Sequence, residues 1–343
     1  MRQALILVGG KGTRLKAVSG DLPKPLVLMA GKPVLLHQLE VLASEGVREV
    51  RLFCGYGTDL FRKFIKSHSI PLDVRLEEES EPLGTAGAVL SLLRQRPNDL
   101  DEEFIVCYGD TLFNLDLSRM SSFHREKKSD ITLWVHPNDH PYDSDLVETD
   151  KESRIVAFHP VSEHRTSYLP NRVNAAFYVI NKAAVIPNRI LPAKIDFIRD
   201  LFPCLLAEGK AIFAYQSREY IKDMGTPDRF ALVEKDLISG KIAKGSLKSS
   251  KSAIFLDRDG TLTDSNEYVS KVELLQLFPF AADAIRQINQ SNYLSVLVTN
   301  QPVVARGACD ESTLEKIHCK LQEDLGRSRA YLDQIYYCPH HPH

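Results

Sequence analysis

The chain has 343 residues, a length that holds about two domains of ordinary size. Hydrophobic residues make up 43% and charged residues 26%, the composition of an ordinary globular protein with enough apolar material for a core. The net charge of −2 gives no electrostatic basis for nucleic acid or an anionic membrane as the main partner. Any anion that the protein binds must therefore be held by local chemistry.

The cysteines and the N-terminus indicate the compartment. The six cysteines are scattered and form no disulfide framework, which is typical of a reducing environment. The first residues read MRQALILVGGKG, where glycines follow a short apolar run in place of a signal-peptide cleavage site. No stretch approaches the roughly 18 apolar residues that cross a bilayer. We therefore expect a soluble, cytoplasmic protein.

Short apolar runs alternate with amphipathic segments along the first two thirds of the chain. The runs predict buried strands, and the segments between them have helical spacing. The predicted strands are Ala4–Val8, Glu49–Cys54, Leu72–Leu76, Phe104–Cys107 and Ile131–Val135, and the predicted helices are Val34–Glu45, Leu60–Ser67 and Ala86–Arg94. This alternation indicates an α/β fold, a Rossmann-like and mostly parallel sheet whose ligands gather at the carboxyl ends of the strands.

A change of composition predicts a second domain. Residues 239–252 are rich in Lys, Ser and Gly and read as a linker. A new apolar strand, Ala253–Leu256, begins directly after it. We therefore expect one domain over 1–238 and a partial, also Rossmann-like domain over 253–343.

A glycine-rich loop, Gly9–Arg14, follows the first predicted strand. Its glycines let the backbone approach a phosphate with its N–H groups, and Arg14 adds a permanent positive charge. The spacing matches neither a Walker A loop nor a dinucleotide fingerprint, and such a loop is as often a simple tight turn. The sequence DLPKP follows, in which two prolines fix the direction of Lys24.

At this point five motifs resemble the sugar-1-phosphate nucleotidyltransferases. In the family's order and spacing they are GGKGTRLK, DLPKPL, EPLGTAGA (Glu81–Ala88), YGDTLF (Tyr108–Phe113) and KDMGTPDRF (Lys222–Phe230). The resemblance covers residues 1–238 and is nearest to guanylyltransferases acting on D-glycero-D-manno-heptose 1-phosphate, with mannose-1-phosphate enzymes close behind. It implies that the chain converts an NTP and a sugar 1-phosphate to an NDP-sugar and pyrophosphate.

The resemblance also implies the roles of individual residues. Arg14 and Lys24 would be catalytic, because both reactants are anions and the reaction needs charge neutralisation and alignment. Asp110 and Asp223 would hold Mg²⁺, whose preferred ligands are carboxylates, waters and phosphate oxygens; alone, each aspartate is more simply a cap or turn residue. The nucleotide would be bound by Val8, Gly9, Gly10, Gly12, Thr13, Arg14, Gly84 and Thr85, and the sugar phosphate by Lys24, His159 and Asn174.

One departure from the family concerns the sugar end of the site. Where the family has Glu-Lys-Pro, this sequence has Phe158, His159 and Pro160. Histidine is a weaker cation than lysine and depends on pH. Either Arg165 or Arg172 replaces the family's lysine, or the sugar phosphate is bound differently.

A second constellation follows the linker. Asp257 and Asp259 end the strand Ala253–Leu256 and point the same way, as residues i and i+2 of a strand do. Such a pair suits a nucleophile and a general acid/base, with Thr299 and Asn300 binding a phosphoryl group. The sequences FLDRDGTLTDSNEYV, LFPFAADAIRQIN, VTNQPVVARG and IYYCPHHP resemble the haloacid dehalogenase-like phosphatases, in the branch that acts on histidinol phosphate and heptose bisphosphate. The resemblance implies Mg²⁺ at Asp257 and Asp259.

This second domain looks truncated. Cys338 and His340 form half of a zinc site, and structural zinc needs four ligands, so Zn²⁺ would require ligands beyond this chain. The later lysine and acidic residues of that phosphatase branch are also missing. We therefore expect no efficient phosphatase activity.

The sequence is compatible with three hypotheses for the function. The leading one is GTP-dependent activation of the heptose 1-phosphate, because both halves resemble enzymes of the same GDP-heptose route towards lipopolysaccharide. The alternative within the class is a mannose-1-phosphate guanylyltransferase or another hexose-1-phosphate enzyme. A different class is a regulatory module that binds a sugar nucleotide without turnover. The nucleobase and the oligomeric state, including a homo-oligomer, are left open.

Overall fold

The computed structural model describes residues 1–10, 12–79, 81–161, 165, 167–185, 194–264 and 268–341. The chain divides into two compact units. Unit 1 comprises Met1–Trp134, Thr149–Val156 and Ala175–Lys248, and unit 2 comprises Val135–Glu148, Ala157–Asn174 and Ser249–His343. The predicted domain boundary at 239–252 stays a prediction.

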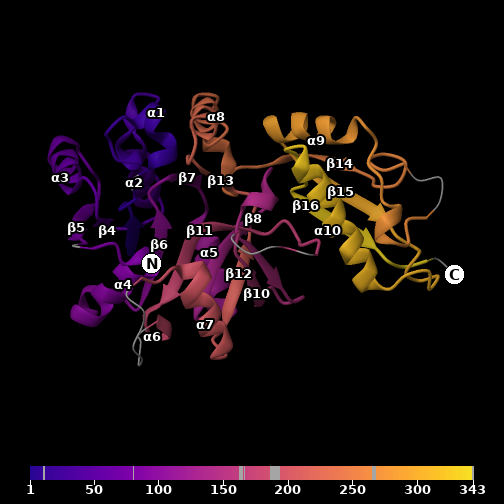
Figure 1. Cartoon of the computed structure of the whole chain (residues 1–343), viewed down its shortest axis with the longest axis horizontal. Coiled ribbons are helices and arrows are strands. Elements are labelled where there is room, and N and C mark those ends of the chain that lie inside the picture. Colours follow the sequence, from indigo (N-terminus) through magenta and orange to yellow (C-terminus); the bar gives the residue numbers. More distant parts are fainter. Residues whose placement is uncertain are drawn as a thin grey trace. The chain divides into compact units, whose positions relative to one another are not determined.

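Unit 1 is built on a mixed sheet that is rich in parallel pairs around β1 (Gln3–Leu7), so the predicted mostly parallel sheet is confirmed in part (Figure 1). β1 pairs in parallel with β4 (Glu49–Cys54) and with β6 (Glu103–Tyr108). Its burial is nearly continuous because a central parallel strand is covered on both faces. The order continues with β5 (Asp73–Glu78), parallel to β4, and with β11 (Val173–Asn181), antiparallel to β6; β8 (Ile131–His136) pairs with β11 and β12 (Ile212–Gln216).

The helices of unit 1 supply its core with apolar side chains. One buried cluster includes Leu35 and Leu39 of α2 (Val34–Ser44), Phe61 of α3 (Thr58–Ser67), Ile6 of β1 and Trp134. The helices are α1 (Lys16–Ser19), α2 (Val34–Ser44), α3 (Thr58–Ser67), α4 (Gly84–Gln95), α5 (Leu117–Glu126), α6 (Lys182–Val185), α7 (Phe202–Ala207) and α8 (Pro227–Ile238). The three predicted helices therefore exist, each within a few residues of its predicted bounds.

β5 corrects one expectation. The sequence predicts a buried strand at Leu72–Leu76, but in β5 exposed positions alternate with partly buried ones. Among the described strands β5 pairs with β4 alone and ends the sheet. An edge strand keeps one side open to solvent, so the strand is present but the prediction of its burial was wrong.

Two small antiparallel pairs complete unit 1. β7 (Thr111–Asn114) pairs with β13 (Tyr220–Asp223), and β2 (Leu28–Met29) with β3 (Lys32–Pro33). Residues following α8 also pack in this unit, where Ile242 is buried and Leu247 donates its N–H to Glu219 at 2.8 Å.

Unit 2 contains a three-stranded parallel sheet in the order β14 (Ser252–Leu256), β15 (Tyr293–Asn300), β16 (Gln334–Cys338). The helices α9 (Ala281–Gln290) and α10 (Glu311–Arg327) cover it, and their apolar side chains form a core with Leu297 of β15. The unit also holds most of β9 (Leu146–Thr149) and the end of β10 (Ile155–His159). Within the described part of the chain, no helix has the length and apolar character needed to span a membrane.

Candidate active site

The glycine loop continues from the carboxyl end of β1 and packs on Lys24. Gly12 has φ +62°, and a Cβ there would stand 2.7 Å from Cγ of Lys24. A side chain at this position is therefore excluded by both backbone conformation and space. Thr13 opens a short 3-10 helix, Thr13–Leu15, whereas the neighbouring Lys11 lies outside the described residues.

Lys24 forms an ion pair with Asp110. Its Nζ lies 3.0 Å from Oδ2 of Asp110, and the lysine side chain is 12% exposed. Asp110 follows β6, with Gly109 between them. A Cβ on Gly109 would lie 2.7 Å from Cγ1 of Val8, so glycine allows the ends of β1 and β6 to approach closely. The two residues that the sequence places in separate motifs thus meet at the end of the central strands.

Asp223 lies next to Asp110 because β7 and β13 pair. Asp223 is opposite Thr111, and the N–H of Met224 donates to the carbonyl of Asp110 at 2.8 Å. The Asp223 carboxylate accepts from Gly225 N–H and from Arg229, whose Nη1 lies 3.0 Å from each oxygen.

Arg14 approaches the same corner, since a Cβ on Gly225 would lie 3.6 Å from its Nη2. Three positions of the predicted phosphate end, Arg14, Asp110 and Asp223, thus lie near one another.

The two aspartates have the chemistry of a magnesium site. Mg²⁺ commonly takes one or two protein carboxylates and completes its shell with waters and substrate phosphates. Among the described residues there is no group of three or more His, Cys, Asp or Glu side chains that could hold a metal. A pair of carboxylates fits an ion that arrives with a nucleotide better than an all-protein cage.

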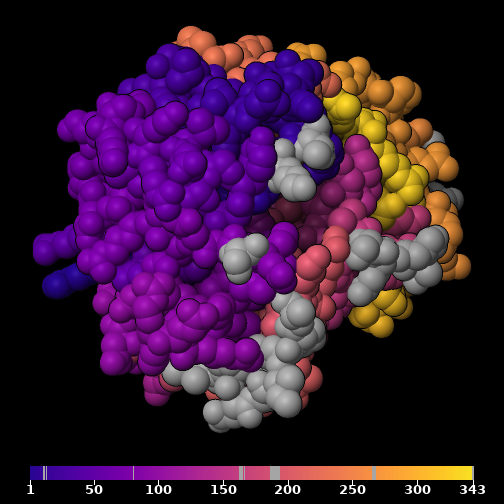
Figure 2. All heavy atoms as spheres, turned by 60° about the vertical axis from the view of Figure 1, so that its left-hand side comes forward, coloured from indigo at the N-terminus to yellow at the C-terminus, as the bar shows by residue number. Residues whose placement is uncertain are grey.

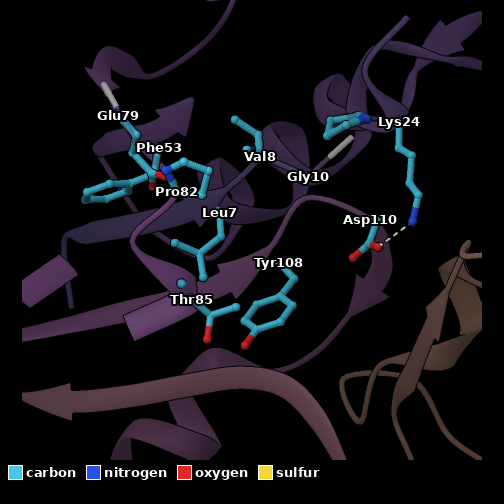
Figure 3. Close-up of a pocket in the computed structure, with 13 residues that line it drawn as sticks. Leu7, Val8, Gly10, Lys24, Phe53, Glu79, Pro82, Thr85, Tyr108 and Asp110 are labelled. Carbon is cyan, nitrogen blue, oxygen red and sulfur yellow. Dashed lines mark hydrogen bonds and ion pairs between the residues drawn. The ribbon is translucent and has the colours of Figure 1, made fainter. Parts of the chain in front are cut away.

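A cavity of about 270 Å³ opens beside the loop. In Figure 2 the surface of unit 1 is recessed among its indigo and violet residues. Figure 3 shows Lys24 and Asp110 at one end of the cavity and Phe53, Glu79 and Pro82 at the other. The lining residues are Leu7, Val8, Gly9, Gly10, Lys24, Pro25, Phe53, Glu79, Pro82, Gly84, Thr85, Tyr108 and Asp110. The predicted nucleotide residues Val8, Gly9, Gly10, Gly84 and Thr85 thus share one cavity with Lys24.

The far end of the cavity carries a carboxylate that the sequence analysis missed. Oε2 of Glu79 lies 3.8 Å from the position of a Cβ on Gly9 and 3.7 Å from the position of a Cβ on Gly55. Burial raises the pKa of Glu79, while a hydrogen bond with the Leu83 backbone opposes that rise. In the sequence Glu79 belongs to a run of acidic residues, which reads as a solvated surface.

Gly84 and Thr85 line the cavity and contact residues 195–197. Gly84 has φ +81°, and a Cβ there would overlap the backbone of Ile195. The Thr85 hydroxyl donates to Asp196 at 2.7 Å and accepts from the N–H of Phe197 at 3.0 Å. Burial, with Asp196 second, raises the pKa of the neighbouring Tyr108, so its phenol stays protonated. Tyr108 lies inside a quoted motif, but Asp196 had no sequence signal.

The predicted sugar-side residues His159 and Asn174 lie in unit 2. Nε2 of His159 is 3.2 Å from a Glu148 oxygen, and the backbone N–H of Asn174 donates to the carbonyl of Asp145 at 2.9 Å. Arg165 donates to the backbone carbonyls of Pro141 (2.8 Å), His159 (2.9 Å) and Ser144. It is therefore engaged in holding this segment together.

Arg172, the other arginine considered for the sugar phosphate, also lies in unit 2. Its pKa is lowered by burial, against which Cys319, Glu315 and Glu148 act. The groups that oppose the effect of burial on its pKa thus all belong to its own unit.

The second predicted site lies at the ends of β14 and β15. Asp257 follows β14, and Oδ1 of its side chain accepts the N–H of Arg258 at 2.7 Å. Thr299 is buried and accepts a hydrogen bond from Gln301 at 2.9 Å, whereas Asn300 is exposed.

Asp259 is held by a buried arginine. Arg258 is 0% exposed and donates to both Asp259 oxygens at 2.8 Å, and Gln301 donates to Asp259 at 2.9 Å. Burial acts to raise the pKa of Asp259, but these hydrogen bonds outweigh it and hold the pKa below its ordinary value.

Cys338 ends β16 and is exposed, and His340 follows two residues later. The described residues place no third or fourth protein ligand with them. The half zinc site therefore stays a prediction.

Comparison with known proteins adds the following. A sequence model of the Nucleotidyl transferase family matches residues 3–240. The mannose-1-phosphate guanylyltransferase of Mycobacterium tuberculosis is 34% identical over 240 residues, which is 69% of this chain and 65% of that protein. The mannose-1-phosphate guanylyltransferase catalytic subunit beta of Danio rerio is 33% identical over 230 residues, 66% of this chain and 62% of that protein. The chain therefore spans slightly less than two thirds of the length of these relatives.

Solved structures are similar to this chain as well. HddC from Yersinia pseudotuberculosis, in complex with GMP-PN, matches with a TM-score of 0.58 at 27% identity. The match covers 69% of this chain and all of the HddC chain. The inositol-1-phosphate CTP transferase from T. maritima, at 22% identity and a TM-score of 0.59, shares the fold. From the matched residues 3–240 and these relatives, the chain belongs to the Nucleotidyl transferase family.

Proposed function

We propose that this chain transfers a guanylyl group from GTP to a sugar 1-phosphate and releases pyrophosphate. The observation that carries the proposal is the cavity of unit 1. It has a partly buried cation, Lys24, and the Asp110 carboxylate at one end and the Glu79 carboxylate at the other. The family assignment and the names of the guanylyltransferase relatives support the same reaction class.

Glu79 favours guanine as the base. A carboxylate only accepts hydrogen bonds, and the Watson–Crick edge of guanine offers two adjacent donors, N1–H and the 2-amino group. Uracil and thymine offer one donor between two carbonyl oxygens, which a carboxylate would repel. Oε2 of Glu79 lies 3.8 Å from the Cβ position of Gly9, so this carboxylate is within one nucleotide's length of the glycine loop.

The chemistry is an in-line displacement at the α-phosphorus. An oxygen of the sugar phosphate forms a bond to this phosphorus, and the bond to the oxygen bridging the α- and β-phosphorus breaks as pyrophosphate leaves. Lys24 offsets the charge of the two anions where they meet, and Arg14 binds the β/γ end. Members of this family typically use Mg²⁺, which Asp110 and Asp223 would hold and which would neutralise phosphate charge.

For the acceptor we propose D-glycero-D-manno-heptose 1-phosphate, bound with the help of His159 and Asn174. The motifs of residues 1–238 and those of residues 253–343 both resemble enzymes that act on this heptose. Mannose 1-phosphate is the second candidate, because the quoted relatives are named for it.

We further propose that residues 253–343 are a haloacid dehalogenase-like unit without efficient phosphatase activity. A general acid must deliver a proton to the leaving group, but the Asp259 carboxylate is engaged by Arg258 and Gln301. Phosphate release from a heptose bisphosphate that Asp257→Asn abolishes would contradict this proposal.

The test of the transferase is a pyrophosphate-release screen of GTP, ATP, CTP, UTP and dTTP against mannose, glucose and heptose 1-phosphates. We expect turnover with GTP and the heptose. Turnover with mannose 1-phosphate alone would select the second candidate. Binding of a sugar nucleotide without turnover of any pair would replace the enzyme by a regulatory module.

A further inference from the structure

Helix α10 belongs to the same compact unit as two segments that precede it by more than a hundred residues. These segments are Val135–Glu148 and Ala157–Asn174, and the second carries His159 and Asn174. Both lie within residues 3–240, which the family model matches, whereas α10 (Glu311–Arg327) lies outside them. Part of the transferase sequence thus packs with the C-terminal sequence.

The first contact runs through Asn171. Its backbone N–H donates to Oε1 of Gln322 in α10 at 2.7 Å, and the residue is 3% exposed. The Asn171 side chain accepts the N–H of Asn138 at 3.1 Å and donates to its carbonyl at 2.8 Å. Gln322 therefore satisfies a buried donor in a residue that ties the two segments together.

The second contact is steric. Gly326, near the end of α10, faces Pro141, and a Cβ on this glycine would lie 2.7 Å from Cγ and from Cδ of the proline ring. A proline ring cannot rotate away, so a methyl group here would push the helix and the segment apart. The close approach depends on glycine.

A third link from α10 is electrostatic and leads to the strands that carry the predicted sugar residues. Glu315 and Cys319 of α10 oppose the lowering of the Arg172 pKa that burial causes. The carbonyl of Arg172 accepts the N–H of Val147 at 3.0 Å, in the same β9–β11 pairing through which Asn174 donates to Asp145.

His159 is tied to this pairing as well. Its Nε2 lies 3.2 Å from Glu148, which belongs to β9. The hydrogen bond of Asn171 to Gln322 and the electrostatic link to Arg172 therefore connect α10 to the β9–β11 pairing that holds both predicted sugar residues.

We propose that α10 is a positioning element for the sugar phosphate, and that Gln322 and Gly326 are its positioning residues. The C-terminal sequence would then take part in acceptor binding by the transferase, whether or not it has an activity of its own. The inference rests on the proposed function, in which His159 and Asn174 contact the sugar phosphate.

The first experiment uses three variants of the full chain. Gln322→Met removes the acceptor at nearly constant volume, Gln322→Glu keeps an acceptor, and Lys316→Ala changes an exposed residue of the same helix. We expect Gln322→Met to raise KM for the sugar phosphate about tenfold, with KM for GTP and kcat within about twofold of the parent. Gln322→Glu should have a KM for the sugar phosphate close to that of the parent, and Lys316→Ala should behave as the parent.

A second readout does not need turnover. Hydrogen exchange of residues 138–148 and 167–174 should be faster in Gln322→Met and in Gly326→Ala than in the parent. In the first variant a buried N–H loses its acceptor, and in the second a methyl group separates the helix from the segment. Exchange in the glycine loop should stay unchanged. The Gly326→Ala variant also keeps the test decisive if Gln322→Met does not fold.

The outcomes separate the two proposals. If the parent turns over no nucleotide and sugar pair, the proposed function fails and this inference fails with it. An active parent whose variants keep the parental KM for the sugar phosphate overturns this inference alone. Equal increases in KM for both substrates, or unchanged exchange of residues 138–148 and 167–174, would likewise overturn it.

Discussion

Arg229 binds Asp223 from one nitrogen, with Nη1 at 3.0 Å from each carboxylate oxygen. The neighbouring Asp110 is paired with Lys24, whose Nζ lies 3.0 Å from one carboxylate oxygen, Oδ2. Both proposed magnesium ligands are thus already neutralised by cations of the chain. A divalent ion that binds Asp223 must share the carboxylate with Arg229 or displace the arginine.

We therefore expect Arg229→Gln to strengthen metal binding by the nucleotide-free protein. The pair is partly exposed, and such pairs contribute on the order of 1 kcal/mol or less, so the gain should be several-fold. Titration with Mn²⁺ followed by electron paramagnetic resonance measures it directly. The double variant Arg229→Gln/Asp223→Asn is the control and should lose the gain. Equal Mn²⁺ affinity in parent and Arg229→Gln would show that the arginine does not compete with the metal.

Asp223→Asn should abolish most of the activity while leaving the fold intact. The amide keeps the shape and one acceptor for Gly225 N–H, but it removes the charge that a divalent ion needs. Loss of a transition-state electrostatic contact typically costs about 100- to 1,000-fold in kcat. Asp228→Asn, an exposed aspartate at the start of α8, is the matched control. A near-parental rate in Asp223→Asn would remove this residue from the site.

Glu79→Gln should weaken selection for GTP. The amide can no longer accept from both guanine donors, and a well-formed bidentate contact to a base is worth about 1–3 kcal/mol of discrimination. We expect kcat/KM for GTP to fall about 10- to 100-fold and that for UTP or dTTP to fall less or rise. Glu81→Gln, which alters an exposed glutamate two residues away, should leave selectivity unchanged. An unaltered ratio of GTP to UTP turnover in Glu79→Gln would show that this carboxylate does not read the base.

The positions of Gly9 and Asp110 could be predicted from sequence because both residues follow strands of the sheet. Gly9 follows β1 and Asp110 follows β6, and the carboxyl ends of neighbouring parallel strands meet at one edge. The two prolines that flank Lys24 fix its direction, whereas its proposed role follows from the resemblance of the DLPKP motif to the family. The same reasoning located the strand ends that carry Asp257 and Thr299.

The partners of these residues could not be predicted in the same way. Glu79 and Arg229 have the charge of ordinary surface residues, and only the fold brings them to the cavity and to Asp223. The contact between Asn171 and Gln322 joins residues 151 positions apart and follows no periodic pattern. The exposure of β5 likewise depends on its position at the edge of the sheet, and a short apolar run in the sequence does not reveal which strands pair.

His318 makes the stability of unit 2 depend on pH. The histidine is 5% exposed, and its Nε2 lies 3.4 Å from Nη1 of Arg258, with Asp259 on the far side of that arginine. Burial, followed by the positive charge of Arg258, lowers the pKa of His318 to about 3, while Asp259 acts weakly in the other direction. The folded unit therefore holds this histidine neutral.

The sign of the pH dependence follows from the two pKa values. An unfolded histidine has a pKa of about 6.5, so between this value and about 3 the unfolded chain binds a proton that the folded unit does not. The full contribution to stability is present above pH 6.5 and is lost as the pH falls. From pH 7.5 to 5.5 we expect a loss of about 1.4 kcal/mol from this group.

Differential scanning calorimetry of the parent and of His318→Gln at the two pH values checks this prediction. Glutamine keeps an acceptor for Arg258 but does not titrate, so the transition of the variant should shift less between pH 7.5 and 5.5. His340→Gln, which changes an exposed histidine of the same unit, should retain the parental shift. Equal shifts in parent and His318→Gln would mean that the histidine takes up a proton in the folded unit as readily as in the unfolded chain, and that its burial beside Arg258 does not persist in solution.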